Sequence, residues 1–329
     1  MDLEGKKPQC ILAVDLGGTK CSAAAIDRKG RIFAHQRAQV DRSSRLAPLK
    51  QILQLAQEIT GSRRAGDAIA SVAVAVPGLV RKNGTVWAPN LPGWKQMPLA
   101  RLLQRDLGIP VLVESDRNAA VLGEWWRGAA RGKSDVIVLT IGTGIGAGIL
   151  SGGNIVRGAH ELSGCVGWMA VSDKEVAQAR SVGELEALVA GPAIARAAQQ
   201  DLRTRPKSRL SKLEVAQITA HDVADAARQG DPLARRIFED CGRILGLAVA
   251  NLVSLFDPEV VVIGGGLAFA SDLYLDTLRK AVLRRAQPLA ARKVRISVSR
   301  LGEKSNLFGC AYLAWQAIAH SRHSVSSPS

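Results

Sequence analysis

The sequence predicts an α/β protein made of two related lobes, and three observations support this fold class. The chain has 329 residues, enough for two domains at about 100–200 residues each. Short apolar runs typical of strands alternate with longer segments of helical period. ILAVDLGGTKCSAAAI, beginning at Ile11, and VIVLTIGTGIGAGIL, beginning at Val136, align without a gap. A supersecondary unit that occurs twice predicts two lobes with a cleft between their glycine bends.

The first lobe is expected to open with a hairpin and to continue with alternating helices and strands. An apolar run over 10–14, a glycine-rich bend over 15–20 and an apolar run over 21–26 predict the hairpin. The same patterns predict further strands over 31–38, 69–76 and 111–114, and helices over 46–60, 99–107 and 118–127.

The second lobe is expected to restart this pattern. A strand over 135–140, a glycine bend over 142–146 and a strand over 147–150 form its hairpin. The remaining expected elements are helices over 183–201, 211–228 and 232–254, strands over 260–263 and 294–298, a helix after the glycines at 264–266, and a last helix over 307–319.

The expected domain boundaries follow from this repeat. We place the N-terminal lobe at 1–130 and the C-terminal lobe at 131–304. The last helix, about 305–320, is expected to pack back on the first lobe. The polar segment 321–329 is expected to be a disordered tail.

The composition excludes several protein classes. Hydrophobic residues make up 47% and charged residues 22%, which excludes disorder as the main state. The five cysteines are far apart and form no CxxC pair, which argues against a disulfide framework and fits a reducing compartment. The N-terminus carries acids and no apolar run, and no apolar stretch reaches the ~20 residues of a membrane helix. We therefore expect a cytoplasmic protein with no membrane partner.

The chain is strongly basic, with 44 Lys+Arg against 29 Asp+Glu and a formal net charge of +15. Such a charge is compatible with nucleic acid, a membrane surface or an anionic small molecule as partner. The arginines are scattered through helical segments rather than gathered in one arm. A solvated basic surface is therefore favoured over nucleic-acid binding.

The first glycine bend, DLGGTK, predicts phosphate binding. Gly17 and Gly18 let backbone N–H groups converge on an anion, which a Cβ would obstruct. Thr19 adds a hydroxyl and Lys20 a positive charge. Asp15 ends its strand beside the bend, where its carboxylate could hold Mg²⁺ through water.

Two further glycine segments strengthen this prediction. Gly142, Thr143, Gly144 and Gly146 form an all-backbone bend for the other end of a triphosphate. Gly264, Gly265 and Gly266 follow a strand and precede a helix, where a nucleotide's base and ribose could approach. A single glycine bend is more often a plain hairpin. Three of them at equivalent places in a duplicated fold favour nucleotide binding.

Asp116 is the candidate general base for phosphoryl transfer. It follows a buried strand and precedes a helix, so its carboxylate is expected to project from the end of the sheet and take a proton from an attacking hydroxyl. Asp is also a favoured N-cap residue, so Asp116 could instead cap that helix. The adjacent Ser115 would serve equally well as the cap and would leave Asp116 free.

Five motifs together resemble the ROK family (repressors, open reading frames, kinases) over nearly the whole chain, from Ile11 to about Ala319. They are DLGGTK, VAVPGLV followed by WAPNLPGW, ESDRNAAVLGE, TIGTGIGAGILSGG and VVVIGGGLA. The resemblance implies an α/β, two-lobed actin-like ATPase (ribonuclease H-like) fold with duplicated mixed sheets flanked by helices. It also implies ATP and Mg²⁺ as cofactors and a sugar as substrate. Members are often dimers, so a homodimer is one expectation.

The resemblance assigns roles to particular residues. The family's catalytic aspartate falls on Asp116, and its phosphate loops fall on the two glycine bends. Its sugar contacts from the Pro-Gly turn and the loop that follows fall on Gly78 and Asn90, with Trp94 as a further candidate.

The chain departs from the family at the sugar site. Ser115 stands where members usually have Asn, Cys165 replaces a sugar-binding Glu, and Trp168 replaces a His that binds sugar and zinc. The zinc cysteines are absent, so zinc is not expected. A later family glutamate falls on Glu186, which would reach a sugar hydroxyl or remain a solvated charge.

These departures leave the sugar site open to two interpretations. Trp168 would either offer a stacking face to a sugar or fill the space of the missing zinc lobe. His160 and Glu161 would either supply polar contacts or lie in a solvated loop. A buried hydroxyl left without its partner costs about 1–3 kcal/mol, so an unusual sugar or polyol is a reasonable alternative to glucose.

Three functions are compatible with these residues. The favoured one is an ATP-dependent sugar kinase of glucokinase or N-acetylhexosamine kinase type. The second is a catalytically weak sugar or nucleotide sensor. A repressor is disfavoured, because the first expected strand begins by Cys10 and leaves no room for a helix-turn-helix ahead of it.

Overall fold

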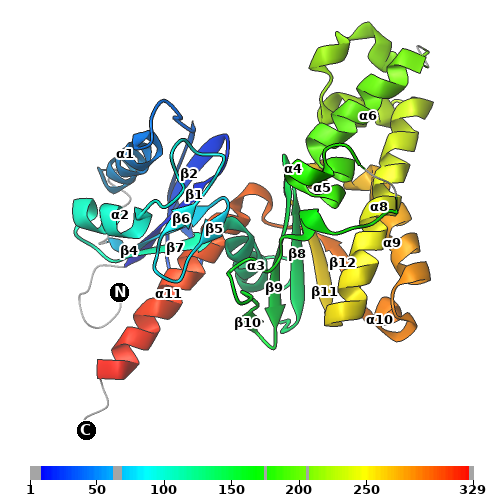
Figure 1. Ribbon diagram of the computed structural model, residues 1–329. Coiled ribbons are helices and arrows are strands. Elements are labelled where there is room, and N and C mark those ends of the chain that lie inside the picture. Colours follow the sequence, from blue (N-terminus) through cyan, green and yellow to red (C-terminus); the bar gives the residue numbers. More distant parts are fainter. Residues whose placement is uncertain (1–8, 62–68, 174–175, 205–206, 326–329) are drawn as a thin grey trace. The chain divides into compact units, whose positions relative to one another are not determined.

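Two five-stranded mixed sheets, each flanked by helices, organise the part of the chain described by the structure, a computed structural model (Figure 1). That part comprises residues 9–61, 69–173, 176–204 and 207–325. The chain divides into two compact units. Unit 1 contains Met1–Gly132, Arg157–Ser163 and Glu303–Ser329, and unit 2 contains Lys133–Val156 and Gly164–Gly302.

The sheet of unit 1 has the strand order β3-β2-β1-β4-β7. In that order its strands are Ile32–Gln39, Lys20–Ile26, Cys10–Leu16, Ile69–Val76 and Val111–Ser115. The first three strands are antiparallel, whereas β1, β4 and β7 are parallel. The carboxyl ends of these three parallel strands therefore lie at one edge of the sheet.

The sheet of unit 2 repeats this arrangement with the order β10-β9-β8-β11-β12. In that order its strands are Asn154–Ile155, Ile145–Ser151, Val136–Ile141, Val260–Gly264 and Arg295–Val298. Again the hairpins are antiparallel and the last three strands parallel. The shared order confirms the predicted duplication.

Each sheet carries helices from its own unit. Unit 1 has α1 (Ala47–Gly61), α2 (Leu99–Leu107), α3 (Asp116–Arg127) and α11 (Ser305–Val325), and a small hairpin of β5 (Leu79–Val80) and β6 (Val86–Trp87). Unit 2 has α4 (Ala179–Val182), α5 (Glu184–Val189), α6 (Gly191–Thr204), α7 (Ala220–Arg228), α8 (Pro232–Phe256), α9 (Ser271–Arg285) and α10 (Pro288–Lys293). In the described ranges, none of these helices is long and apolar enough to cross a membrane.

Close helix packing anchors α11 in unit 1. A Cβ on Gly123 of α3 would collide with the carbonyl oxygen of Ser305, and one on Gly309 of α11 would collide with that of Ala119. Both helices need glycine at this crossing, because only glycine lets two backbones approach so closely. The helix extends to Val325, beyond the expected end at Ala319. Residues 326–329 of the expected tail lie outside the described residues.

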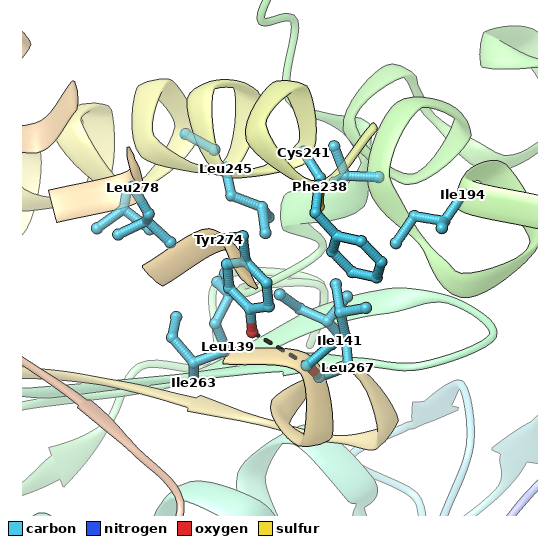
Figure 2. Packing of buried hydrophobic residues seen from close by; sticks show 14 of the residues in the cluster. Leu139, Ile141, Ile194, Phe238, Cys241, Leu245, Ile263, Leu267, Tyr274 and Leu278 are labelled. Carbon is cyan, nitrogen blue, oxygen red and sulfur yellow. Dashed lines mark hydrogen bonds between the residues drawn. The ribbon is translucent and has the colours of Figure 1, made fainter. Parts of the chain in front are cut away.

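The core of unit 2 lies between its sheet and the helices α8 and α9 (Figure 2). Phe238 and Leu245 of α8 face Ile141 and Leu139 of β8, and all four side chains are buried. Tyr274 of α9 is also buried, and its hydroxyl donates to the carbonyl oxygen of Leu267 at 3.3 Å. A buried tyrosine hydroxyl needs such a partner.

Two predicted helices differ from the structure. The segment 183–201 is two helices, α5 and α6, because Pro192 has no N–H to continue the helical hydrogen bonds. The segment 211–228 is helical only from Ala220, after the short 3₁₀ turns Arg209–Lys212 and Val215–Gln217. Thr219 and Asp222 form a capping box that fixes this later start.

Candidate active site

Asp15, Gly78 and Asp116 lie at the same edge of the unit 1 sheet. Asp15 is the penultimate residue of strand β1 and is paired with Ala75 of β4. Gly78 follows the end of β4, and its carbonyl oxygen accepts a hydrogen bond from Arg117 Nη2 at 3.4 Å. Asp116 follows β7 directly and is the first residue of α3. The three predicted site residues thus come from the ends of three adjacent parallel strands.

Ser115, rather than Asp116, caps helix α3. The Ser115 side chain accepts a hydrogen bond from the backbone N–H of Asn118 at 3.4 Å. Asp116 Oδ1 accepts one from the backbone N–H of Arg117 at 2.8 Å. Of the two capping residues that the sequence left open, Ser115 therefore has this role.

The Asp116 carboxylate is poised to accept a proton near neutral pH. Burial raises its pKa to about 6, and the positive charge of Arg117 and the backbone hydrogen bonds oppose this rise. A general base works best when its pKa lies near the working pH. The environment of Asp116 therefore suits proton abstraction from a hydroxyl.

Asp15 is held by a residue from the far end of the chain. Asn306 Nδ2, at the start of α11, donates to Asp15 Oδ1 at 2.9 Å. Burial raises the pKa of Asp15 to about 7; the Asn306 hydrogen bond lowers it, and the negative charges of Asp116 and Glu303 raise it. Asn306 could not be predicted from the sequence, because no local pattern marks a contact between residues 291 positions apart.

The first glycine bend has an open surface. Gly17 N–H donates to the Lys20 carbonyl oxygen at 2.9 Å, which closes the turn. A Cβ on Gly18 would meet nothing within 4 Å, so an approaching anion would find space there. Thr19 and Lys20 are exposed, and Lys20 Nζ lies 3.6 Å from Glu303. These features permit the predicted phosphate contact.

The second glycine bend and the glycine triplet adjoin each other in unit 2. Gly142 N–H donates to the carbonyl oxygen of Gly144 at 2.9 Å. Because β8 and β11 are parallel and Gly264 pairs with Thr140, both glycine segments follow the same sheet edge. Gly265 has φ +79°, and a Cβ there would collide with the backbone of Ile141. Glycine is therefore required at Gly265.

Glu186 contacts the second glycine bend. Its Oε2 accepts a hydrogen bond from the backbone N–H of Ile145 at 2.7 Å, and a Cβ on Gly144 would lie 2.9 Å from that oxygen. Burial raises the pKa of Glu186, and the Ile145 N–H opposes the rise. The carboxylate is therefore not a freely solvated charge. It supports the turn between β8 and β9 from helix α5.

Cys165 precedes the 3₁₀ turn Val166–Trp168 in unit 2, and Trp168 is the last residue of that turn. Trp168 is 59% exposed, so the interpretation that it fills the space of a lost zinc lobe is wrong. Its ring offers an accessible apolar face instead. Cys165 is half-buried, and the intervening Gly167 lies close to Glu186.

The two candidate sugar contacts in the loop after Gly78, Asn90 and Trp94, differ in their exposure to solvent. Asn90 is exposed, and its carbonyl oxygen accepts a hydrogen bond from Arg42 Nη2. Trp94 is 1% exposed, and its Nε1 donates to the Arg45 carbonyl oxygen at 2.8 Å. Trp94 is thus a core residue, and the suggestion that it contacts a sugar is wrong.

Asp15 supplies one carboxylate of the kind that a water-mediated magnesium site uses. Two partly buried carboxylates with raised pKa values, at Asp15 and Asp116, favour a cation that would offset their repulsion. Mg²⁺ prefers about one or two carboxylates together with water and phosphate oxygens. Within the described ranges, no group of three or more His, Cys, Asp or Glu side chains could hold a metal ion.

Comparison with known proteins identifies the family. A model of the ROK family matches residues 11–317. The chain belongs to the ROK family. The fold of this ROK protein is that of the actin-like ATPases, with two mixed sheets and flanking helices.

Relatives of this ROK protein include kinases and repressors. It is 34% identical over 312 residues to a glucokinase of Streptomyces coelicolor, covering 92% of this chain and 96% of the relative. A crystal structure of a Streptomyces griseus ROK glucokinase with glucose and AMPPNP is 32% identical, with a TM-score of 0.78 and coverage of 93% and 99%. A xylose repressor of Caldicellulosiruptor bescii is 32% identical over 246 residues, which cover 74% of this chain and 61% of the repressor.

Proposed function

We propose that this chain is an ATP-dependent sugar kinase in which Asp116 activates the attacking hydroxyl. The observation that carries the proposal is the position of Asp116. Its carboxylate lies at the carboxyl end of β7, is released from helix capping by Ser115 and has a pKa of about 6. The glucokinase relatives, which align over nearly the whole chain, support ATP as donor and a hexose as acceptor.

Each group in the proposed mechanism has a defined task. Asp116 accepts the proton of the sugar hydroxyl as the hydroxyl oxygen bonds to the γ-phosphorus of ATP and the bond between that phosphorus and ADP breaks. The backbone N–H groups of the first glycine bend bind phosphate oxygens in unit 1, and those of the second bend do so in unit 2. Gly264–Gly266 leave room for the nucleoside. Mg²⁺, held through water by Asp15, would neutralise the phosphate charge.

The sugar class is a finer part of the proposal. Gly78, Asn90, Ser115, Cys165, Trp168 and Glu186 are the candidate substrate contacts. The exposed Trp168 ring favours an acceptor with an apolar face, as a pyranose has. We propose glucose or an N-acetylhexosamine as the first acceptors to test, followed by other hexoses and polyols.

A coupled ADP-release assay over this panel tests the proposal. Wild-type protein should release ADP in the presence of at least one sugar, and Asp116→Asn should lose that turnover by at least about a hundredfold. Asp106→Asn is the matched control, because Asp106 pairs with Arg105 on the surface of α2. Sugar-dependent turnover that persists in Asp116→Asn would refute the role of Asp116.

A sensor is the second candidate function. Cys165 and Trp168 occupy positions where the resemblance would place a glutamate and a histidine, and repressors occur among the relatives. Saturable ATP and sugar binding without turnover on the whole panel would favour this function over the kinase.

A further inference from the structure

Glu114 is a buried carboxylate two residues before Asp116. It is 4% exposed and lies in β7. Its Oε1 accepts hydrogen bonds from the backbone N–H of Ser115 at 2.8 Å and from Asn118 Nδ2 at 2.9 Å. Glu114 thereby binds the residue that precedes α3 and a residue in the first turn of that helix. A buried carboxylate requires charge compensation as well as hydrogen bonds.

Arg157 supplies that compensation from a distant segment. Its Nη1 donates to Glu114 Oε1 at 3.1 Å and its Nη2 to Glu114 Oε2 at 2.5 Å. This is the bidentate geometry in which a guanidinium binds a carboxylate most strongly. The segment Arg157–Ser163 belongs to unit 1, although Val156 before it and Gly164 after it belong to unit 2. The ion pair therefore fastens this loop to the β7–α3 junction.

The loop itself is tightly constrained. Ser163 N–H donates to the Arg157 carbonyl oxygen at 3.0 Å and closes it. Glu161 has φ +60°, a left-handed conformation that costs free energy in a residue other than glycine. Its side chain is only 11% exposed, and its Oε2 lies 3.5 Å from Arg157 Nη1. Arg157 thus pairs with two carboxylates, that of Glu114 on β7 and that of Glu161 within its own loop.

We propose that Arg157 and Glu114 are positioning residues that fix the 157–163 loop beside the Asp116 junction as a recognition loop for the acceptor substrate. The acceptor would be a polyhydroxylated small molecule, whose hydroxyls suit the Glu161 carboxylate and the exposed His160 imidazole. The inference rests on the proposed kinase function. It adds that acceptor recognition depends on a loop 43 residues from Glu114 in the sequence.

Steady-state kinetics provide the first test. Arg157→Ala should raise the KM for the acceptor about tenfold to a hundredfold through misplacement of the loop, while the KM for ATP changes less than about twofold. Arg157→Lys should recover only part of the loss, since lysine cannot bind in bidentate fashion. Adding Glu114→Gln to Arg157→Ala should not restore the acceptor KM, since the bidentate contact that fixes the loop is absent in both variants. Arg243→Ala is the control, because Arg243 forms an exposed pair with Asp240.

Hydrogen exchange provides a second test that does not need turnover. In Arg157→Ala the amide of Ser163 should exchange at least about tenfold faster than in wild type, while amides of α9 are unchanged. Unchanged exchange at Ser163, or acceptor and ATP KM values that rise equally, would overturn the proposal. If wild-type protein phosphorylates no acceptor, the kinase function fails, and the exchange result still decides whether Arg157 fixes the loop. If Arg157→Ala does not fold, Glu161→Gln must raise the acceptor KM selectively, or the recognition role is refuted.

Discussion

Two aspartates with raised pKa values determine the chemistry available in unit 1. Burial raises the pKa of Asp116 to about 6 and that of Asp15 to about 7, and the charge of Asp116 adds to the rise at Asp15. For Asp116 itself, burial is the cause of the rise, and the positive charge of Arg117 opposes it. Only the ionised form of Asp116 can accept a proton from a hydroxyl.

The raised pKa of Asp116 predicts the pH dependence of catalysis. kcat/KM for the acceptor should fall as the pH is lowered through about 7 to 6, because protonation removes the base. Activity that stays constant down to pH 4.5 would contradict the account.

The same raised pKa values mean that the ionised carboxylates destabilise the fold above this range, so Asp116→Asn should melt at a higher temperature than wild type at pH 8.

Asn306 provides a separate test of Asp15. The Asn306 hydrogen bond lowers the pKa of Asp15, so Asn306→Leu should raise that pKa and weaken magnesium binding. The magnesium concentration for half-maximal activity should rise about threefold to tenfold. Asn251→Leu is a suitable control, because Asn251 is exposed on α8. An unchanged magnesium dependence in Asn306→Leu would separate Asp15 from the metal.

At the level of elements, the ends of the parallel strands could be predicted from the sequence. The residues on other elements that contact the site could not. The apolar runs located β1, β4 and β7, and with them Asp15 and Asp116. Asn306 and Arg157 escaped prediction because their contacts depend on how α11 and the 157–163 loop pack in three dimensions. The same limit applied to Glu186, whose bond to Ile145 needs α5 to pack beneath the second bend.

A single methyl group added at Gly18 tests whether the first glycine bend binds the phosphates of ATP. Gly18→Ala should leave the melting temperature within about 2 °C of wild type, because no atom lies within 4 Å of the added Cβ. It should weaken ATP binding about tenfold or more, since the Cβ would obstruct the approach of phosphate to the bend. Isothermal titration with ATP measures this.

Gly61→Ala is the matched control, because Gly61 at the end of α1 also has open space and no strained backbone. ATP affinity that is equal in Gly18→Ala and Gly61→Ala would show that the first bend does not bind phosphate.

At the level of the whole molecule, the duplication could be predicted from the sequence, because each copy of the repeated hairpin appears as a local pattern of apolar runs around a glycine bend. The hairpin with a glycine bend precedes two parallel strands in both units, and the strand orders match. Function is less accessible at this scale, since kinases and repressors share the ROK fold. The choice between these functions must therefore be argued from individual residues such as Trp168. The sequence left two roles open for Trp168, and its 59% exposure excludes the core-filling one.

The central claim is that Asp116 transfers the proton of an acceptor hydroxyl during phosphoryl transfer. A single-turnover experiment with radiolabelled ATP tests it most directly, with ATP affinity measured on the same samples. Asp116→Asn should bind ATP within about threefold of wild type and form sugar phosphate at least about a hundredfold more slowly. Sugar phosphate formed at the wild-type rate by Asp116→Asn would contradict the claim.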